Sequence, residues 1–283
     1  MSSHRGNVAD ADRWGDRVDQ RHLDGTGPTR PHRPDFALVG SVGGFFALRT
    51  GAPGPAHVPL ASVYGGDHRP LTGRVDTVAA RLRAPERRIA ASIAQLGLAA
   101  RLWSVALGSA VLTGAVPGLD PRELRWDPDL GSPDDLVLTD DPATARTLPA
   151  TAASVREVVQ YGHLVPLSDA LRREGRISSR LLWGNAGSAL AGAVRELTRW
   201  GERNGRPEVA ERAGALAAEL FGHPDLRTTG TSLPGTSLLG ASPIGAFRRR
   251  SCCLYYRCPT GALCGDCVFD RPPPRSSVRA ESG

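Results

Sequence analysis

The five cysteines of this chain all lie within residues 252–267, in the string CCLYYRCPTGALCGDC. With Cys258 set aside, the spacing is C-C-x10-C-x2-C, formed by Cys252, Cys253, Cys264 and Cys267. Four thiolates on one short segment can hold a metal ion or an iron–sulfur cluster, or they can pair as disulfides. We therefore expect the chemistry of the protein to reside in this segment.

Disulfides are the less favoured of these uses. The N-terminal string MSSHRGNVADADRWGDRVDQ has no apolar stretch of the kind that marks secretion signals, so we expect a cytoplasmic protein. Structural disulfides are rare in that reducing compartment, where clustered cysteines more often bind metal or act in redox chemistry. An odd number of cysteines also leaves one thiol over in any complete pairing.

The adjacent pair Cys252 and Cys253 separates the two metal alternatives. Structural zinc sites draw on ligand pairs with spacers, and two neighbouring ligands fit poorly on one tetrahedral ion. In a two-iron cluster the adjacent cysteines have more freedom over which iron each one meets. The spacing therefore favours a [2Fe–2S] cluster, with zinc as the alternative. The gap between Cys258 and Cys264 breaks the plant-type ferredoxin spacing, so we expect Cys258 to lie outside the ligand set.

The string RRRSCCLYYRCPTGALCGDC resembles the C-terminal [2Fe–2S] segment of FhuF-type ferric-siderophore reductases. Upstream, LAARLWSVALGSAVLTGAVPGLDPRELRWDP and LLWGNAGSALAGAVREL are similar to the body of the actinobacterial branch of that family. The resemblance covers much of the span 35–269, more loosely in the middle. It implies four cluster ligands, namely Cys252, Cys253, Cys264 and Cys267.

The resemblance further implies one-electron reduction of ferric siderophore complexes, chiefly hydroxamates, which frees ferrous iron in the cytoplasm. Hydroxamates surround the metal with hard oxygen donors, and these hold ferrous iron far less tightly than ferric iron. Such a reaction needs no acid, base or nucleophile, and we identify no catalytic residue beyond the cluster. Two alternatives stay open: an iron–sulfur sensor without turnover, and a zinc-stabilised binding domain.

The electron must come from outside the chain. The string VGSVGG has the order G-x-x-G-G, which differs from the G-x-G-x-x-G dinucleotide fingerprint, and no flavin motif is present. We therefore expect an external donor, such as a ferredoxin or a flavin reductase.

Basic residues flank the cysteines. A cluster becomes more negative on reduction, so nearby cations raise its potential; the candidates are Arg248, Arg249, Arg250 and Arg257. Backbone amides of Gly261 and Gly265 are candidate donors to sulfur. The chain contains no lysine, and all 35 basic residues are arginine. A general coding bias thus accounts for arginine at these positions as readily as a local role does.

Composition limits the partners. The net charge is +6, but aromatic residues make up only 5 % and no basic stripe is interleaved with aromatics, so we expect no nucleic-acid binding. Residues 102–119 carry no charge, which is long enough for a membrane span. Glycine and proline interrupt this stretch, so we predict a buried helix and at most peripheral membrane association.

His163 and His223 have no second metal ligand at usable spacing and are expected to be structural or solvated.

We predict an α+β protein with a predominantly helical body, a few short strands and a C-terminal cluster loop. Apolar periodicity predicts helices from residue 75 onward, with Pro85 opening the second helix at its first turn, and again over 152–173 (interrupted near Pro166), 176–200 and 207–221. Strands are expected in DFALVGSVGGFFALRT, LRWDP and DLVLTD. The expected divisions are a disordered extension (1–34), a siderophore-binding body ending in a linker (35–247), the cluster segment (248–270) and a disordered tail (271–283).

Overall fold

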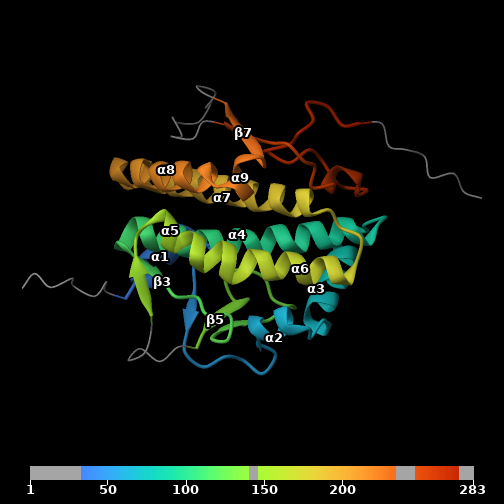
Figure 1. Cartoon of the computed structure of the whole chain (residues 1–283), viewed down its shortest axis with the longest axis horizontal. Coiled ribbons are helices and arrows are strands. Elements are labelled where there is room, and N and C mark those ends of the chain that lie inside the picture. Colours follow the sequence, from blue (N-terminus) through green and yellow to red (C-terminus); the bar gives the residue numbers. More distant parts are fainter. Residues whose placement is uncertain (1–32, 140–145, 234–245, 274–283) are drawn as a thin grey trace, which may run out of the picture. The chain divides into compact units, whose positions relative to one another are not determined.

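The computed structural model describes residues 33–139, 146–233 and 246–273, which belong to one unit of the chain, Pro31–Gly283. The predicted N-terminal extension and C-terminal tail lie almost entirely outside the described residues. Helices dominate the described part, as the periodicity predicts (Figure 1). They are α1 (Phe36–Gly40), α2 (Leu60–Gly65), α3 (Arg69–Leu82), α4 (Arg87–Thr113), α5 (Ala152–Val155), the π-helix η1 (Arg156–Leu164), α6 (Val165–Glu174), α7 (Ser179–Arg203), α8 (Pro207–Gly222), α9 (Pro224–Arg227) and the 3-10 turn η2 (Tyr255–Arg257).

Helix α4 forms the centre of the core and packs against α3 and α7. Residues 101–112 are buried on every side, which is what a helix that is apolar all round requires. This helix is long and apolar enough to cross a membrane, but 78% of its apolar window is buried inside the protein. Arg101, in the buried middle of this helix, pairs with Asp135 at 2.9 Å. The expected buried helix is thus present, and it ends at Gly114, whose φ of 73° stops it three residues before Pro117.

Within the described residues, short strands form three small sheets. The largest has the order β1-β5-β4-β2, in which β1 pairs parallel with β5 and the other neighbours are antiparallel; its strands are β1 (Arg49–Thr50), β2 (Val58–Pro59), β4 (Leu124–Trp126) and β5 (Leu136–Leu138). Strands β4 and β5 confirm the two strands predicted in LRWDP and DLVLTD. The antiparallel pairs are β3 (Ala115–Pro117) with β6 (Thr147–Pro149), and β7 (Gly230–Leu233) with β8 (Ala246–Arg249).

Two local predictions were wrong. Residues 35–50 were expected to contain a strand, but only the last two, Arg49 and Thr50, form one (β1); the stretch begins as α1 because the Asp35 carboxylate accepts hydrogen bonds from the N–H groups of Ala37 and Leu38 and caps a helix. The linker expected before the cysteines contains two strands instead, with Thr231 opposite Arg248. Residues 234–245 between them lie outside the described residues.

The predicted interruption near Pro166 takes the form of a π-helix. The helix from Ala152 to Glu174 continues through η1, so the chain does not break before the proline. Pro166 is the second residue of α6 and directly follows the π-helical segment. The helix α7 that follows packs on α4 and α8, and these contacts create the surface on which the cysteine segment rests.

Candidate functional site

The cysteine segment begins where β8 ends, and β8 lies against α7. The close packing of this part of the chain on α7 depends on two glycines of the helix. A Cβ on Gly184 would overlap Oγ of Ser251, and a Cβ on Gly187 would overlap Oγ1 of Thr229. The Ser251 hydroxyl also donates to the carbonyl of Arg180 at 3.2 Å. Two glycines of α7 therefore set how closely the cysteines approach the helical body, on the side of α7 where β7 lies in Figure 1.

Two of the predicted ligands meet directly. The Sγ atoms of Cys253 and Cys264 lie 3.7 Å apart. Two thiolates on one tetrahedral metal, each about 2.3 Å from it, lie about 3.8 Å apart. The pair thus has the separation that a shared iron requires. Nowhere in the described chain do three or more His, Cys, Asp or Glu side chains converge as ligands of one ion. A [2Fe–2S] cluster does not require such a group, because its four cysteines supply only two thiolates to each iron.

The other two predicted ligands, Cys252 and Cys267, are partly exposed. Each sulfur accepts a backbone hydrogen bond, from the N–H of Leu254 at 3.2 Å and from the N–H of Phe269 at 3.5 Å. The hydrogen bond with the Cys253 thiol lowers the pKa of Cys252 to about 7. A larger thiolate fraction near neutral pH suits a metal ligand, because the thiolate is the form that binds.

A buried guanidinium lies beside these thiols. Arg249 is only 2 % exposed, and its charge interacts with Cys252, Cys253 and Cys264. Its Nη2 donates to Oδ1 of Asn185, whereas Nε and Nη1 are buried and have no hydrogen-bond partner in the described structure. A buried N–H without an acceptor costs about 1–3 kcal/mol. Cluster sulfur would supply the missing acceptors, so the site fits a [2Fe–2S] group.

The later half of the segment is anchored on α7 by Asp266. Its buried carboxylate accepts a hydrogen bond from the Ser188 hydroxyl at 2.5 Å and pairs with Nη1 of Arg195 at 3.0 Å. Its backbone carbonyl accepts from the N–H of Arg249 at 3.0 Å. Because Asp266 lies between Cys264 and Cys267, these contacts fix both cysteines relative to the helix.

Cys258 lies at the end of η2 and is fully buried. Burial raises the pKa of its thiol, which favours the neutral form over the thiolate that metals bind. Nearby, the N–H of Gly261 donates to the Cys258 carbonyl at 2.9 Å, and a Cβ at Gly261 would overlap the carbonyl oxygen of Tyr255. The loop around Cys258 is thus closely packed backbone, in keeping with a structural role for that cysteine.

The four arginines singled out in the sequence have different surroundings. Arg248 pairs with Asp270 at 2.8 Å, and Arg257 pairs with Glu86 at 2.6 Å, which ties η2 to the start of α4. Arg250 is exposed. Arg249 alone among these four is buried. It is therefore the arginine whose charge we expect to act most strongly on a cluster.

A cavity of about 460 Å³ opens beside Cys264. Its wall on the cysteine side consists of Arg249, Cys264, Gly265 and Asp266. The remaining lining is mainly small or apolar and comes from α4, α7 and the turn after α1, including Val42, Phe45, Leu96, Ala100, Ala189, Gly192 and Ala193. Phe45 at this cavity is 46% exposed. Arg101 holds the turn in place by donating to the carbonyls of Gly44 and Phe45 at 2.9 and 2.6 Å.

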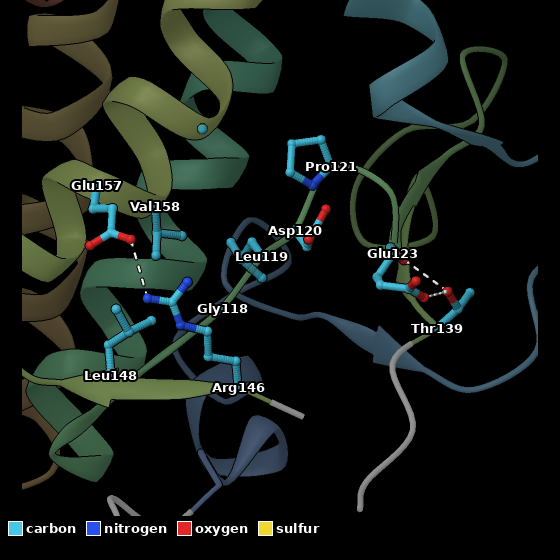
Figure 2. A pocket seen from close by; sticks show the side chains of 11 residues that line it. Gly118, Leu119, Asp120, Pro121, Glu123, Thr139, Arg146, Leu148, Glu157 and Val158 are labelled. Atoms are coloured by element: carbon cyan, nitrogen blue, oxygen red, sulfur yellow. Dashed lines mark hydrogen bonds and ion pairs between the residues drawn. The ribbon is translucent and has the colours of Figure 1, made fainter. Parts of the chain in front are cut away.

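A second cavity, of about 550 Å³, is lined by residues of the β3–β4 connection and η1 and contains no cysteine. Figure 2 shows two polar contacts at this cavity, in which Arg146 donates to Glu157 at 3.3 Å and the Thr139 hydroxyl donates to Glu123 at 2.8 Å. Thr139 and Arg146 flank residues 140–145, which lie outside the described residues. This cavity therefore offers no redox group and is not the candidate site.

The two histidines are hydrogen-bonded, as expected. Buried His163 donates from Nε2 to the Leu119 carbonyl at 2.6 Å and accepts at Nδ1 from the Tyr64 hydroxyl at 3.0 Å. His223 interacts with the Tyr161 hydroxyl at 3.1 Å. Both rings thus have structural partners.

Sequence reasoning missed three residues that support the cysteines, namely Ser92, Asn185 and Asp266. The first two are polar residues within apolar stretches of long helices, and that mismatch was the available signal. Asp266 lies inside the C-x2-C spacing, where only the fold reveals its partners on α7.

Comparison with known proteins supports the reading of the cysteines. Residues 249–269 match the family model described as the FhuF 2Fe-2S C-terminal domain. A search of curated proteins finds no match to the chain. The matched segment contains all four cysteines of the C-C-x10-C-x2-C spacing, and it decides between the two metal alternatives. The chain therefore carries a FhuF-type [2Fe–2S] domain at residues 249–269, and its cofactor is a [2Fe–2S] cluster.

Proposed function

We propose that this protein reduces ferric siderophore complexes, chiefly hydroxamates, by one electron and thereby releases ferrous iron in the cytoplasm. The observation that carries the proposal is the cavity whose wall includes Cys264. When bound, the cluster supplies the electron. A ligand in this cavity would lie next to a ligating sulfur, and short distance is what an outer-sphere transfer needs.

The lining suits the organic part of such a complex. Phe45 and Leu96 offer apolar contact, while Ala100, Gly192 and Ala193 leave the volume open. Ligand cavities in proteins are mostly apolar with a few polar groups, and here the charged groups are Arg249 and Asp266 on the cysteine wall and Arg195 and Glu196 on α7. The chain's residues thus bind and orient the substrate, and the proposed ligands Cys252, Cys253, Cys264 and Cys267 hold the cluster.

The electron has to be delivered by an external donor, for which a ferredoxin or a flavin reductase is suitable. Three of the four proposed ligand cysteines are partly exposed, so a donor can approach the cluster from solvent. We propose no nucleic-acid partner, and at most a peripheral contact with a membrane.

The decisive experiment mixes dithionite-reduced protein with a ferric tris-hydroxamate under anaerobic conditions. We expect the visible absorption of the oxidised cluster to return, with one ferrous ion captured by a chelator for each cluster reoxidised. Protein without its cluster, prepared as the Cys264→Ser variant, serves as the control. A reduced cluster that stays bleached beside every ferric complex tried contradicts the proposal and favours the sensor.

A further inference from the structure

The buried polar residues behind the cysteines form one connected chain of hydrogen bonds. Arg249 donates to Oδ1 of Asn185, and Nδ2 of Asn185 donates to the carbonyl and the hydroxyl of Ser92 at 2.9 and 3.1 Å. The Ser92 hydroxyl in turn donates to the carbonyl of Cys253 at 2.9 Å. These hydrogen bonds therefore connect the Cys253 carbonyl to the Arg249 guanidinium through Ser92 of α4 and Asn185 of α7.

This network has a single arrangement. Asn185 and Ser92 are 0% exposed, so no water replaces their partners. Because the amide nitrogen of Asn185 is committed to Ser92, its oxygen must face Arg249. The guanidinium is held by that oxygen at Nη2, which leaves Nε and Nη1 buried and without an acceptor among the described residues.

We propose that Arg249 donates hydrogen bonds to cluster sulfur and holds the reduction potential of the cluster high, and that Asn185 and Ser92 are positioning residues that fix its orientation. The physical reason is that reduction adds negative charge to the cluster. A buried cation stabilises the reduced form strongly, because little solvent screens it. Hydrogen bonds to sulfur and net charge are two of the known determinants of such potentials. This inference depends on the cluster and not on the siderophore.

The test is an anaerobic redox titration of the full-length holoprotein, followed by visible and electron paramagnetic resonance spectra. We expect Arg249→Gln to lower the ratio of reduced to oxidised cluster at a fixed applied potential about tenfold, a shift of about 59 mV for a one-electron couple. Arg249→Lys keeps the charge and should shift the potential less. Arg250→Gln is the matched control, since its exposed charge is screened by water and salt.

A second variant keeps Arg249 in place. Asn185→Asp puts a carboxylate where the amide oxygen meets the guanidinium, and it should lower the potential in the same direction by partly cancelling the cation. If Arg249→Gln fails to retain a cluster, Asn185→Asp decides the question. Potentials for Arg249→Gln and Asn185→Asp that differ from the parent by no more than Arg250→Gln would overturn the proposal. No siderophore is needed, so this failure is distinct from failure of the proposed reductase activity.

Discussion

Cys253 and Cys264 are eleven positions apart in the chain, yet their Sγ atoms lie 3.7 Å from each other. This is the separation of two thiolates on one tetrahedral metal at about 2.3 Å each. The fold thus places Cys253, the second of the two adjacent cysteines, next to Cys264, the first cysteine of the C-x2-C motif.

The pairing predicts which cysteines the cluster needs. Cys253→Ser and Cys264→Ser each remove one of the two sulfurs of a shared iron, so we expect purified protein with little iron, little acid-labile sulfide and no visible absorption. Cys258→Ala should retain both, because its buried thiol lies outside the proposed ligand set. Iron and sulfide analysis after anaerobic purification measures this. Full cluster content in Cys264→Ser, or its loss in Cys258→Ala, would show that the assignment is wrong.

Filling the cavity should separate substrate binding from the cluster. Gly192 lines the cavity, and the nearest atom that its Cβ would meet is Nη2 of Arg195 at 3.7 Å, so Gly192→Phe has room for its first atom. We expect a normal visible spectrum and slower reoxidation by a ferric hydroxamate. Gly73→Phe, at an exposed glycine of α3, is the control. Equal stopped-flow rates in the two variants would place the substrate elsewhere.

Two glycines of the cysteine segment provide a matched pair for stability. A Cβ at Gly261 would overlap the Tyr255 carbonyl oxygen, whereas a Cβ at Gly265 meets nothing within 4 Å. We expect Gly261→Ala to destabilise the loop by about 1–3 kcal/mol, the usual cost of overpacking. Gly265→Ala should change stability little. Chelator-driven loss of the cluster, followed over temperature, compares the two; equal rates would contradict the close packing at Gly261.

Removing the buried carboxylate of Asp266 should lower the free energy of unfolding more than removing an exposed carboxylate does. Asp266→Asn leaves Arg195 without its anion and weakens the anchor of the C-x2-C pair on α7. Breaking a buried pair in this way costs about 3–5 kcal/mol, reduced here because the Arg195 side chain is 31% exposed. Glu196→Gln breaks an exposed pair with Arg199 and should cost under about 1 kcal/mol. Denaturant unfolding of both variants measures the difference, and similar costs would contradict the anchoring role.

His163 predicts how stability depends on pH. Burial lowers its pKa from 6.5 to about 4, so the folded protein resists protonation of a ring that the unfolded chain protonates readily. Between pH 6.5 and 4 the ring is protonated in the unfolded chain but not in the folded protein. The free energy of unfolding therefore falls as pH falls from 6.5 towards 4. Between pH 6.5 and 5 this loss is about 2 kcal/mol. We expect the free energy of unfolding of His163→Gln to fall less over that range than that of the parent. Parallel pH profiles would rule out this contribution.

The sequence was sufficient for the elements whose signals are local. The cysteine spacing indicated the cluster, and apolar periodicity indicated the helices that became α4, α7 and α8. The stretch after Asp35 was misread because one capping carboxylate outweighed an apolar run that is also typical of strands. Strands β7 and β8 were missed because their pairing joins residues on either side of a Gly/Pro/Ser-rich stretch.

The surroundings of the cluster were beyond sequence reasoning for another reason. Arg249 could not be distinguished from Arg248 and Arg250, because only tertiary packing buries one of three consecutive arginines. Asn185 and Ser92 meet across two helices separated by 93 positions, and no spacing rule connects them. The cavity likewise draws its lining from five separate stretches of the chain.

The close approach of β8 to α7 has a consequence for tolerance to change. Any side chain at Gly184 or Gly187 would push the strand outward and take the metal-binding residues with it. A survey of all single substitutions, selected for growth on chelated iron, should consequently show two groups of intolerant positions. One is the four proposed ligand cysteines, and the other is a pair of glycines about seventy residues upstream, in a helix that supplies none of the proposed ligands.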